Sequence, residues 1–231
     1  MTCPSSDRRL AVATTGFLLL LLAWEATGMD LRLAHFSGSA SGFALREHWF
    51  LEGWLHQGGR LAGWTASLAL CAAVWWPVGW LKQLDMNERL RLAVIPLISA
   101  LAVVTFKGLS AASCPWDLTD FGGVARYVSH WHGFIASDGG SGHCFPAGQA
   151  SSGFCFVGGY FVLHPRMPRI GWAWLAASVT VGFALGIAQQ LRGAHFMSHT
   201  LWTGALCWMV GWAVNRAWPA ARPVAHGVSF E

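Results

Sequence analysis

The chain contains the stretch IGWAWLAASVTVGFALGIAQQLRGAHFMSH at residues 170–199. Its first part is apolar and long enough to cross the hydrocarbon core of a bilayer, which takes about 20 residues. Its last part places Arg192, His195 and His199 where the next apolar stretch begins. Residues three and four apart share one face of a helix, so these side chains are expected to lie together. Because ionisable groups at membrane depth are costly and usually functional, the stretch predicts a transmembrane helix that ends in a functional cluster.

The composition extends this prediction to the whole chain. Of the 231 residues, 54% are hydrophobic and 11% are charged, whereas roughly a quarter are charged in a typical soluble domain. Apolar stretches that could span a bilayer lie near residues 10–29, 61–81, 90–106, 149–164, 170–191 and 196–217. We predict one all-α integral membrane domain over residues 1–231. It would be a six-transmembrane-helix bundle whose outward-facing loops carry the active site.

The basic residues predict the orientation of the bundle. They concentrate in the N-terminus, the second and fourth connections and the C-terminus: Arg8, Arg9, Lys82, Arg89, Arg91, Arg166, Arg169, Arg216 and Arg222. By the positive-inside rule both termini are cytoplasmic, and connections 30–60 and 107–148 face outward. We therefore predict a multi-pass protein of the bacterial inner membrane with its active site toward the periplasm. The net charge of +4 follows from this topology and does not indicate a nucleic-acid partner. Stretch 10–29 is too long for a signal peptide and is expected to be retained.

Two features of the outward connections give further expectations. Segment 42–59 mixes apolar residues with Glu52 and His56, a pattern typical of an amphipathic helix at the membrane interface. Cys114 and Cys144 lie in the same outward connection. An oxidising compartment would permit a disulfide between them, but sequence alone leaves the pairing open.

Three separated segments are expected to meet at the outward membrane face. Lys107 closes the third apolar stretch, Gly148 and Gln149 open the fourth, and the run from Arg192 to His199 joins the fifth to the sixth. A helix that begins at Gly148 or Gln149 would present free backbone N–H groups there. Together with the cationic side chains of Lys107 and Arg192, these backbone donors predict a site for an oxyanion such as phosphate.

At this point the chain resembles the type 2 phosphatidic acid phosphatase superfamily of membrane lipid phosphatases. The resemblance covers residues 107–202, with a phosphatase-like core at about 90–217. The family's first signature is a lysine, six residues and Arg-Pro. Here six residues separate Lys107 from Cys114-Pro115. The second signature, Pro-Ser-Gly-His, reads Pro146-Ala147-Gly148-Gln149. Lysine, proline and glycine match, whereas the arginine and the histidine do not.

The third signature of the family is an arginine, five residues, a histidine, three residues and an aspartate. Aligning its histidine with His195 puts Gln189 at the arginine and His199 at the aspartate. The resemblance implies that His195 is the nucleophile, forms a phosphohistidine and needs neither a metal nor another cofactor. Lys107 and the backbone at Ala147 and Gly148 would bind phosphate. His199 would orient the nucleophile, and Arg192 or Arg126 of the outward connection would replace the missing guanidinium.

Position 149 leaves three interpretations open. The family uses a histidine there to protonate the leaving group, and the amide of Gln149 has no proton to give at neutral pH. Either His143, His130 or His132 supplies the proton, or the chain is not catalytic, or a histidine has been replaced at this position. Loss of an acid would leave a slow enzyme, and a pyrophosphate leaving group would suffer least.

The function predicted from the sequence is hydrolysis of a lipid phosphate monoester or pyrophosphate. Undecaprenyl pyrophosphate, phosphatidylglycerophosphate, phosphatidate and lipid A phosphate are the substrates that the resemblance offers. A non-catalytic phospholipid-binding or transport protein that keeps the anion site is the alternative. A metal site is a further one, because histidines four apart often bind zinc. Arg192 beside them would repel a cation. The oligomeric state is not predicted.

Overall fold

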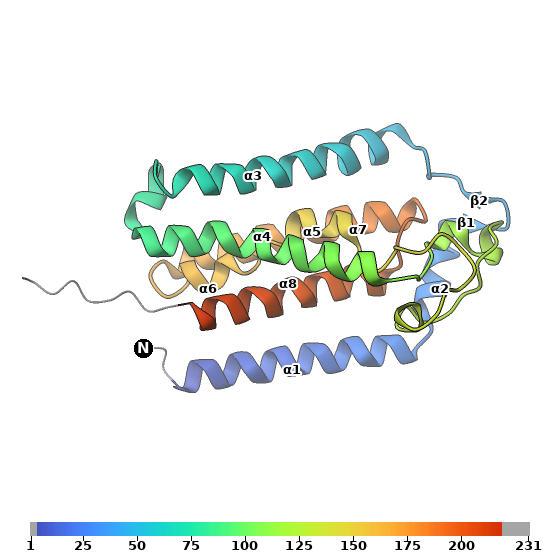
Figure 1. Ribbon diagram of the computed structural model, residues 1–231, viewed down its shortest axis with the longest axis horizontal. Coiled ribbons are helices and arrows are strands. Elements are labelled where there is room, and N and C mark those ends of the chain that lie inside the picture. The colour runs from blue at the N-terminus through green and yellow to red at the C-terminus, as the bar shows by residue number, and fades with distance from the viewer. Residues whose placement is uncertain (1–3, 219–231) are drawn as a thin grey trace, which may run out of the picture.

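The computed structural model describes residues 4–218 and is mostly helical, as Figure 1 shows. The long helices are α1 (Pro4–Ala26), α3 (Gly59–Ala73), α4 (Met86–Leu109), α7 (Pro168–Leu191) and α8 (Met197–Ala217). The short α-helices are α2 (Met29–Ala34), α5 (Gly148–Phe154) and α6 (Gly159–Leu163). The remaining elements are strands β1 (Gly38–Ser39) and β2 (Gly42–Phe43), the π-helix η1 (Phe50–Gly58), and the 3-10 turns η2 (Gly79–Gln83), η3 (Pro115–Asp117), η4 (Thr119–Phe121) and η5 (His132–Phe134). The all-α prediction is confirmed apart from one two-stranded ribbon.

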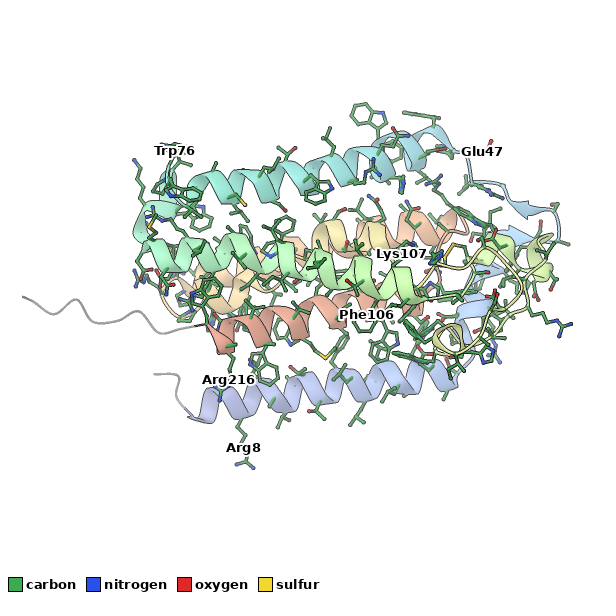
Figure 2. The ribbon with its side chains drawn as sticks, viewed as in Figure 1. Arg8, Glu47, Trp76, Phe106, Lys107 and Arg216 are labelled. Atoms are coloured by element: carbon green, nitrogen blue, oxygen red, sulfur yellow. A yellow bond between two sulfur atoms is a disulfide. The ribbon has the colours of Figure 1, made fainter. Side chains whose placement is uncertain are left out.

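The long helices run side by side, with α1 and α3 on opposite sides of the bundle (Figure 1). The short helix α5 packs against α3, α4, α7 and α8. The start of α1 and the end of α8 lie at one end of the bundle, and the loops with β1, β2 and α2 lie at the other. Figure 2 accordingly places Arg8 and Arg216 toward the first end, and Lys107 and Glu47 toward the second, which we call the loop end.

Two helices, α4 and α7, are long and apolar enough to cross a membrane. In α1 the apolar part is the shorter segment Leu10–Ala26. Large apolar side chains on the outer faces of the bundle are exposed, including Leu20 at 72%, Leu68 at 66% and Leu101 at 65%. Exposed apolar surface of this extent is typical of contact with lipid or a partner. These observations support membrane association.

The fourth apolar stretch does not form the single helix expected over 149–164. It divides into α5 and α6, which are separated by a turn at 155–158. At Gly158, an added Cβ would lie 2.8 Å from the Cα of Gly211 in α8. The two backbones therefore meet where neither residue has a side chain. The prediction of an unbroken fourth helix was wrong because this close backbone contact replaces a regular packed helix.

The outward segment 42–59 also differs from expectation. It begins with β2 and a turn, and only its second half is helical, as η1. That π-helix continues directly into α3, because Gly58 and Gly59 both keep right-handed helical angles. The segment is therefore not one separate interfacial helix. Its second half extends α3 to the loop end of the bundle.

Candidate functional site

A cavity of about 390 Å³ opens at the loop end and collects side chains from several segments. Lys107 reaches it from α4, Gly148 and Gln149 from the start of α5, and His195 from the connection between α7 and α8. The structure thus brings together in one cavity these four residues, which the sequence analysis assigned to a phosphate site. The apolar part of the lining includes Pro96, Leu97, Ala100 and Val104 of α4.

Local backbone features fix the relative positions of Lys107, Gly148 and His195. At Gly148 an added Cβ would lie 3.6 Å from Cδ of Lys107, so the lysine stem passes directly over the first turn of α5. Gly193 has a φ of 75°, which lets the chain turn sharply between α7 and α8. Ala147, which is fully buried and precedes α5, donates its backbone N–H to the carbonyl oxygen of His199 at 3.4 Å. The start of α5 is therefore joined to the start of α8.

His195 is 7% exposed and has its Nδ1 3.5 Å from Sγ of Cys144. Burial lowers the pKa of His195 well below its usual value, and the positive charge of Lys107 adds to the effect. The ring is therefore neutral at pH 7 and keeps a nucleophilic lone pair. Since Nδ1 faces the sulfur, Nε2 is the nitrogen left for chemistry in the cavity.

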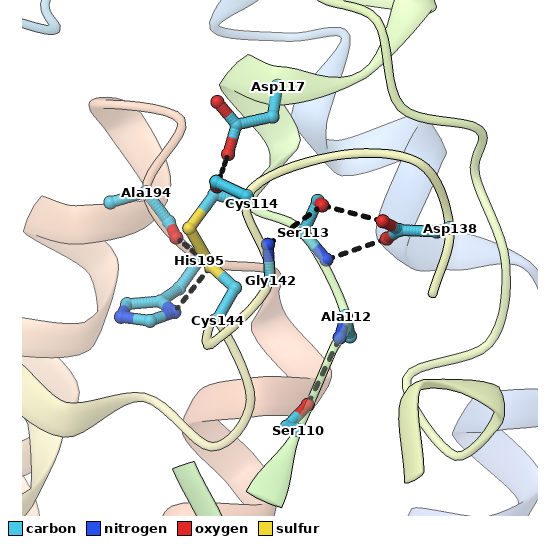
Figure 3. Close-up of a disulfide and its surroundings, with 11 residues drawn as sticks. Ser110, Ala112, Ser113, Cys114, Asp117, Asp138, Gly142, Cys144, Ala194 and His195 are labelled. Carbon is cyan, nitrogen blue, oxygen red and sulfur yellow. Dashed lines mark hydrogen bonds between the residues drawn. A yellow bond between two sulfur atoms is a disulfide. The ribbon is translucent and has the colours of Figure 1, made fainter. Parts of the chain in front are cut away.

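Cys114 and Cys144 form a disulfide that packs against this connection, as Figure 3 shows. Sγ of Cys144 lies 2.8 Å from the carbonyl oxygen of Ala194. A bridged sulfur has no proton to donate, so this is a close contact and not a hydrogen bond. The disulfide therefore fixes the position of the backbone that carries His195.

His199 is 1% exposed, and its ring centroid lies 5.8 Å from that of His195. Its Nδ1 is buried without a hydrogen-bond partner. His199 lines a second cavity, whose lining does not include His195. The expected shared helical face does not form, because α8 begins at Met197 and His195 precedes it in the connection from α7. The two rings are nevertheless adjacent, and each histidine lines its own cavity.

The amide of Gln149 is held by the outward segment. Its Nε2 donates to the backbone carbonyl of Leu55 at 3.0 Å and to that of His56 at 2.9 Å. Gln149 is 6% exposed, so both bonds are shielded from water. The residue at the position of the family's acid histidine therefore anchors η1 over the cavity.

Within the part of the chain that the structure describes, Arg192 is not among the residues that line the cavity. Its Nε donates to the carbonyl of Arg46 at 2.8 Å, and one terminal nitrogen donates to Oε1 of Gln189 at 3.3 Å. The other terminal nitrogen lies 3.6 Å from a carboxylate oxygen of Glu52. The guanidinium expected to bind phosphate is thus engaged with the outward segment, and Gln189 is its partner there.

Sequence reasoning missed two cavity residues, His56 and Arg60. His56 comes from the segment that had been interpreted as an interfacial helix, and Arg60 follows that segment directly, in the first turn of α3. Nδ1 of His56 is buried without a hydrogen-bond partner. Burial lowers the pKa of His56, and the charges of Arg192 and Arg60 lower it further. Their four-residue spacing, the same as that of the histidine pair, was the one signal that could have indicated a shared face.

The three loop histidines considered as acids lie elsewhere. His143 and His132 are exposed. Nδ1 of His143 lies 3.2 Å from the backbone oxygen of Lys107, outside the cavity lining. His130 is buried in the lining of the second cavity, with Nε2 3.4 Å from Oε1 of Glu25. Glu25 also accepts a hydrogen bond from Nε1 of Trp202 at 2.8 Å.

A metal centre is the other chemistry that the histidine pair suggests. Ligand atoms of Cys144, His195 and His199 all lie within 4.8 Å of one another. Zinc binds cysteine as a thiolate, whereas Cys144 is bridged to Cys114. With the disulfide formed, the group offers only two imidazoles, fewer than the three or four ligands of protein zinc sites.

The arrangement as a whole is cationic, partly buried and supplied with neutral imidazoles. Lys107 and Arg60 can bind the oxygens of an anion, while His195 and His56 present nitrogens to it. Comparison of the chain with models of protein families, with curated proteins and with solved structures finds no match.

Proposed function

We propose that the protein is a membrane lipid phosphatase that hydrolyses a phosphate monoester or pyrophosphate at the loop end of the bundle. The observation that carries the proposal is the shared cavity of Lys107, Arg60, His56 and His195. The partial match to the phosphatase signatures supports the same assignment. The exposed apolar faces of α1, α3 and α4 support a membrane location.

In the proposed reaction, Lys107 and Arg60 bind the non-bridging oxygens and neutralise charge as the phosphoryl group moves. Nε2 of His195 attacks phosphorus and the bond to the leaving oxygen breaks. Water then attacks the phosphohistidine, which releases inorganic phosphate and restores the free imidazole. The attack makes the ring a cationic phosphoimidazolium that keeps its proton on Nδ1. Hydrolysis, in which the proton of the attacking water passes to the group that protonated the leaving oxygen, restores the neutral ring that burial favours.

His56 is the proposed acid for the leaving group. Gln149 cannot supply a proton, and its amide is bonded to the backbone of η1. In the empty cavity, burial and neighbouring cations lower the pKa of His56. A bound phosphate dianion counteracts those charges and raises that pKa toward its ordinary value, which favours the protonated imidazole when substrate is present. Substrate binding therefore counteracts the effect of the neighbouring cations on His56.

The proposed topology has six spans, with both termini cytoplasmic and the cavity toward the periplasm of a bacterium. The basic residues at the end opposite the cavity follow the positive-inside rule. The substrate is a lipid phosphate that enters from the outer leaflet. Its phosphate group must reach Lys107 while its chains remain among the apolar side chains of the helices.

The test is phosphate release by the purified full chain in detergent, with short-chain phosphatidate and a prenyl pyrophosphate as substrates. We expect turnover by the parent, an acid-labile phosphoprotein that forms on His195, and loss of both in His195→Gln. His48→Gln is the matched control, since His48 is exposed outside the cavity. Absence of phosphate release from every lipid phosphate tried, with inorganic phosphate still bound, would instead support the alternative of a non-catalytic phospholipid-binding or transport protein.

A further inference from the structure

The second cavity, of about 370 Å³, is lined by residues at the end of α1, in α2 and in the outward loop. His199 belongs to its lining, together with His130 and three acidic residues: Glu25, Asp30 and Asp138. Arg126 is the one lysine or arginine in that lining, and its side chain is exposed. The formal charges of the cavity therefore sum to a negative value, opposite in sign to the phosphate cavity.

The carboxylates of this cavity are bonded to neutral donors. Asp30 accepts from Nε1 of Trp24 and from the backbone N–H of Ser198, both at 3.0 Å. Asp138 accepts from the backbone N–H and the hydroxyl of Ser113, both at 2.7 Å. Among residues 4–218, no lysine or arginine forms an ion pair with these two aspartates or with Glu25. The negative charge of the cavity is therefore not neutralised by the fold.

The titration of neighbouring groups shows the effect of that charge. Burial raises the pKa of Tyr127 to about 12, and the carboxylates of Asp30 and Glu25 contribute to the rise. Burial also lowers the pKa of His130 to about 4, so that ring is neutral and does not cancel the charge of Glu25. The cavity thus offers a field that attracts a cation.

Two histidines in the lining each have a ring nitrogen without a hydrogen-bond partner. Nε2 of His130 and Nδ1 of His199 are buried without a hydrogen bond, in side chains that are 4% and 1% exposed. Nε2 of His130 is the atom 3.4 Å from Glu25. Buried polar atoms of this kind are normally satisfied, and unpaired ones indicate a missing ligand or water. A neutral imidazole can accept one N–H through its unprotonated nitrogen.

These observations select the kind of cation. A bare metal ion needs ligand atoms gathered at one point, and within the described part of the chain the only such group is that of Cys144, His195 and His199. The carboxylates of this cavity do not form such a group, and its lining also holds the aromatic residues Trp24, Tyr127 and Trp131. Dispersed carboxylates, aromatic walls and imidazole acceptors suit an organic cation that carries N–H donors.

We propose that the second cavity binds a primary ammonium group, with Glu25 and His130 as its principal acceptors. The ammonium is either that of a free amine or that of a lipid head group. A quaternary ammonium should bind with lower affinity than a primary ammonium, because it has no N–H to donate to the imidazole. The site does not depend on phosphate hydrolysis, since its residues are distinct from Lys107, Arg60 and His56.

The experiment measures binding of isotopically labelled ethanolamine to the purified full chain at pH 7 by ligand-detected magnetic resonance. We expect saturable binding that is weakened at least tenfold in Glu25→Gln and in His130→Phe. The first variant keeps an acceptor oxygen for Trp202, and the second keeps a ring to stack on Phe145. Glu47→Gln, an exposed position outside the cavity, should bind like the parent.

Competition defines the ligand class. Tetramethylammonium and ethylene glycol should displace the labelled ethanolamine at least tenfold less well than unlabelled ethanolamine does. Displacement by nanodiscs of phosphatidylethanolamine, but not of phosphatidylglycerol, would identify a lipid head group as the source, and no displacement by either would identify a free amine. Absence of saturable binding by the parent, or equal affinity in the parent and both variants, overturns the proposal. Because no turnover is measured, neither result depends on the phosphatase assignment.

Discussion

Replacement of Lys107 by methionine should weaken phosphate binding by about ten- to a hundredfold. The lysine stem passes over the first residue of α5, with its Cε 3.8 Å from the place of a Cβ on Gly148. A phosphate in direct contact with the ammonium at the start of this helix would have its charge about 4 Å away, where two unit charges interact by about 4 kcal/mol at an effective dielectric constant of 20. The cavity is open to water and Arg60 supplies a second cation, so about 1.4–2.8 kcal/mol of this is expected to be lost.

Isothermal titration of the full chain with inorganic phosphate or vanadate measures this loss without turnover. Methionine retains an apolar stem over Gly148, so the variant removes mainly the charge. Lys82→Met is the matched control, because Lys82 lies in η2 at the opposite end of the bundle and is exposed. A dissociation constant for Lys107→Met within twofold of the parent would refute the placement of phosphate beside Lys107. Equal weakening in both variants would show a non-specific effect of net charge.

Three further predictions follow from the same contacts. His56→Gln should slow hydrolysis of a phosphate monoester about a hundredfold or more, but that of a pyrophosphate much less; an equal loss for both substrates in steady-state assays would count against His56 as the acid. Cys144→Ser should lower the free energy of unfolding by about 3–4 kcal/mol, given a separation of 30 residues between the bridged cysteines; denaturant unfolding checks this, and a reductant should destabilise the parent but not the variant. The pKa of His130 is lowered from 6.5 to about 4 by burial, so the folded state binds this proton less readily than the unfolded state. Stability should be complete above about pH 6.5 and fall by up to about 3 kcal/mol as the pH drops toward 4, whereas His130→Phe should lack this component in unfolding curves recorded across that range.

The sequence predicted helices best where the apolar pattern was long. The apolar pattern over residues 90–106 and 170–191 corresponds to α4 and α7, because in such stretches composition alone favours a helix. It failed at 149–164, where Gly158 meets Gly211 at close range. Such a contact depends on a partner about 50 residues away along the chain, and no local pattern reports it.

The candidate site shows the same division. Lys107, Gly148 and His195 could be selected because their order and spacing resemble a known arrangement. His56 could not, because segment 42–59 looks like an ordinary amphipathic helix until its position over the cavity is known, and Arg60 directly follows that segment. Arg192 was assigned to phosphate on helical spacing, but spacing does not reveal that Glu52 and Arg46 of a distant segment engage its guanidinium.

The bonds from Gln149 to the carbonyls of Leu55 and His56 have an evolutionary consequence. A histidine at position 149 would supply a proton donor, but its ring cannot donate two hydrogen bonds to adjacent carbonyls from one nitrogen. The helical segment that carries His56 and Arg60 would then lose the two hydrogen bonds that hold it to position 149. Positions 149 and 56 are therefore expected to covary among descendants of a common ancestor. Where position 149 is a histidine, it supplies the proton and does not hold the segment around position 56. Where position 149 is a glutamine, it holds that segment, and a histidine at position 56 supplies the proton. Single exchanges between such lineages should be less active than either parent.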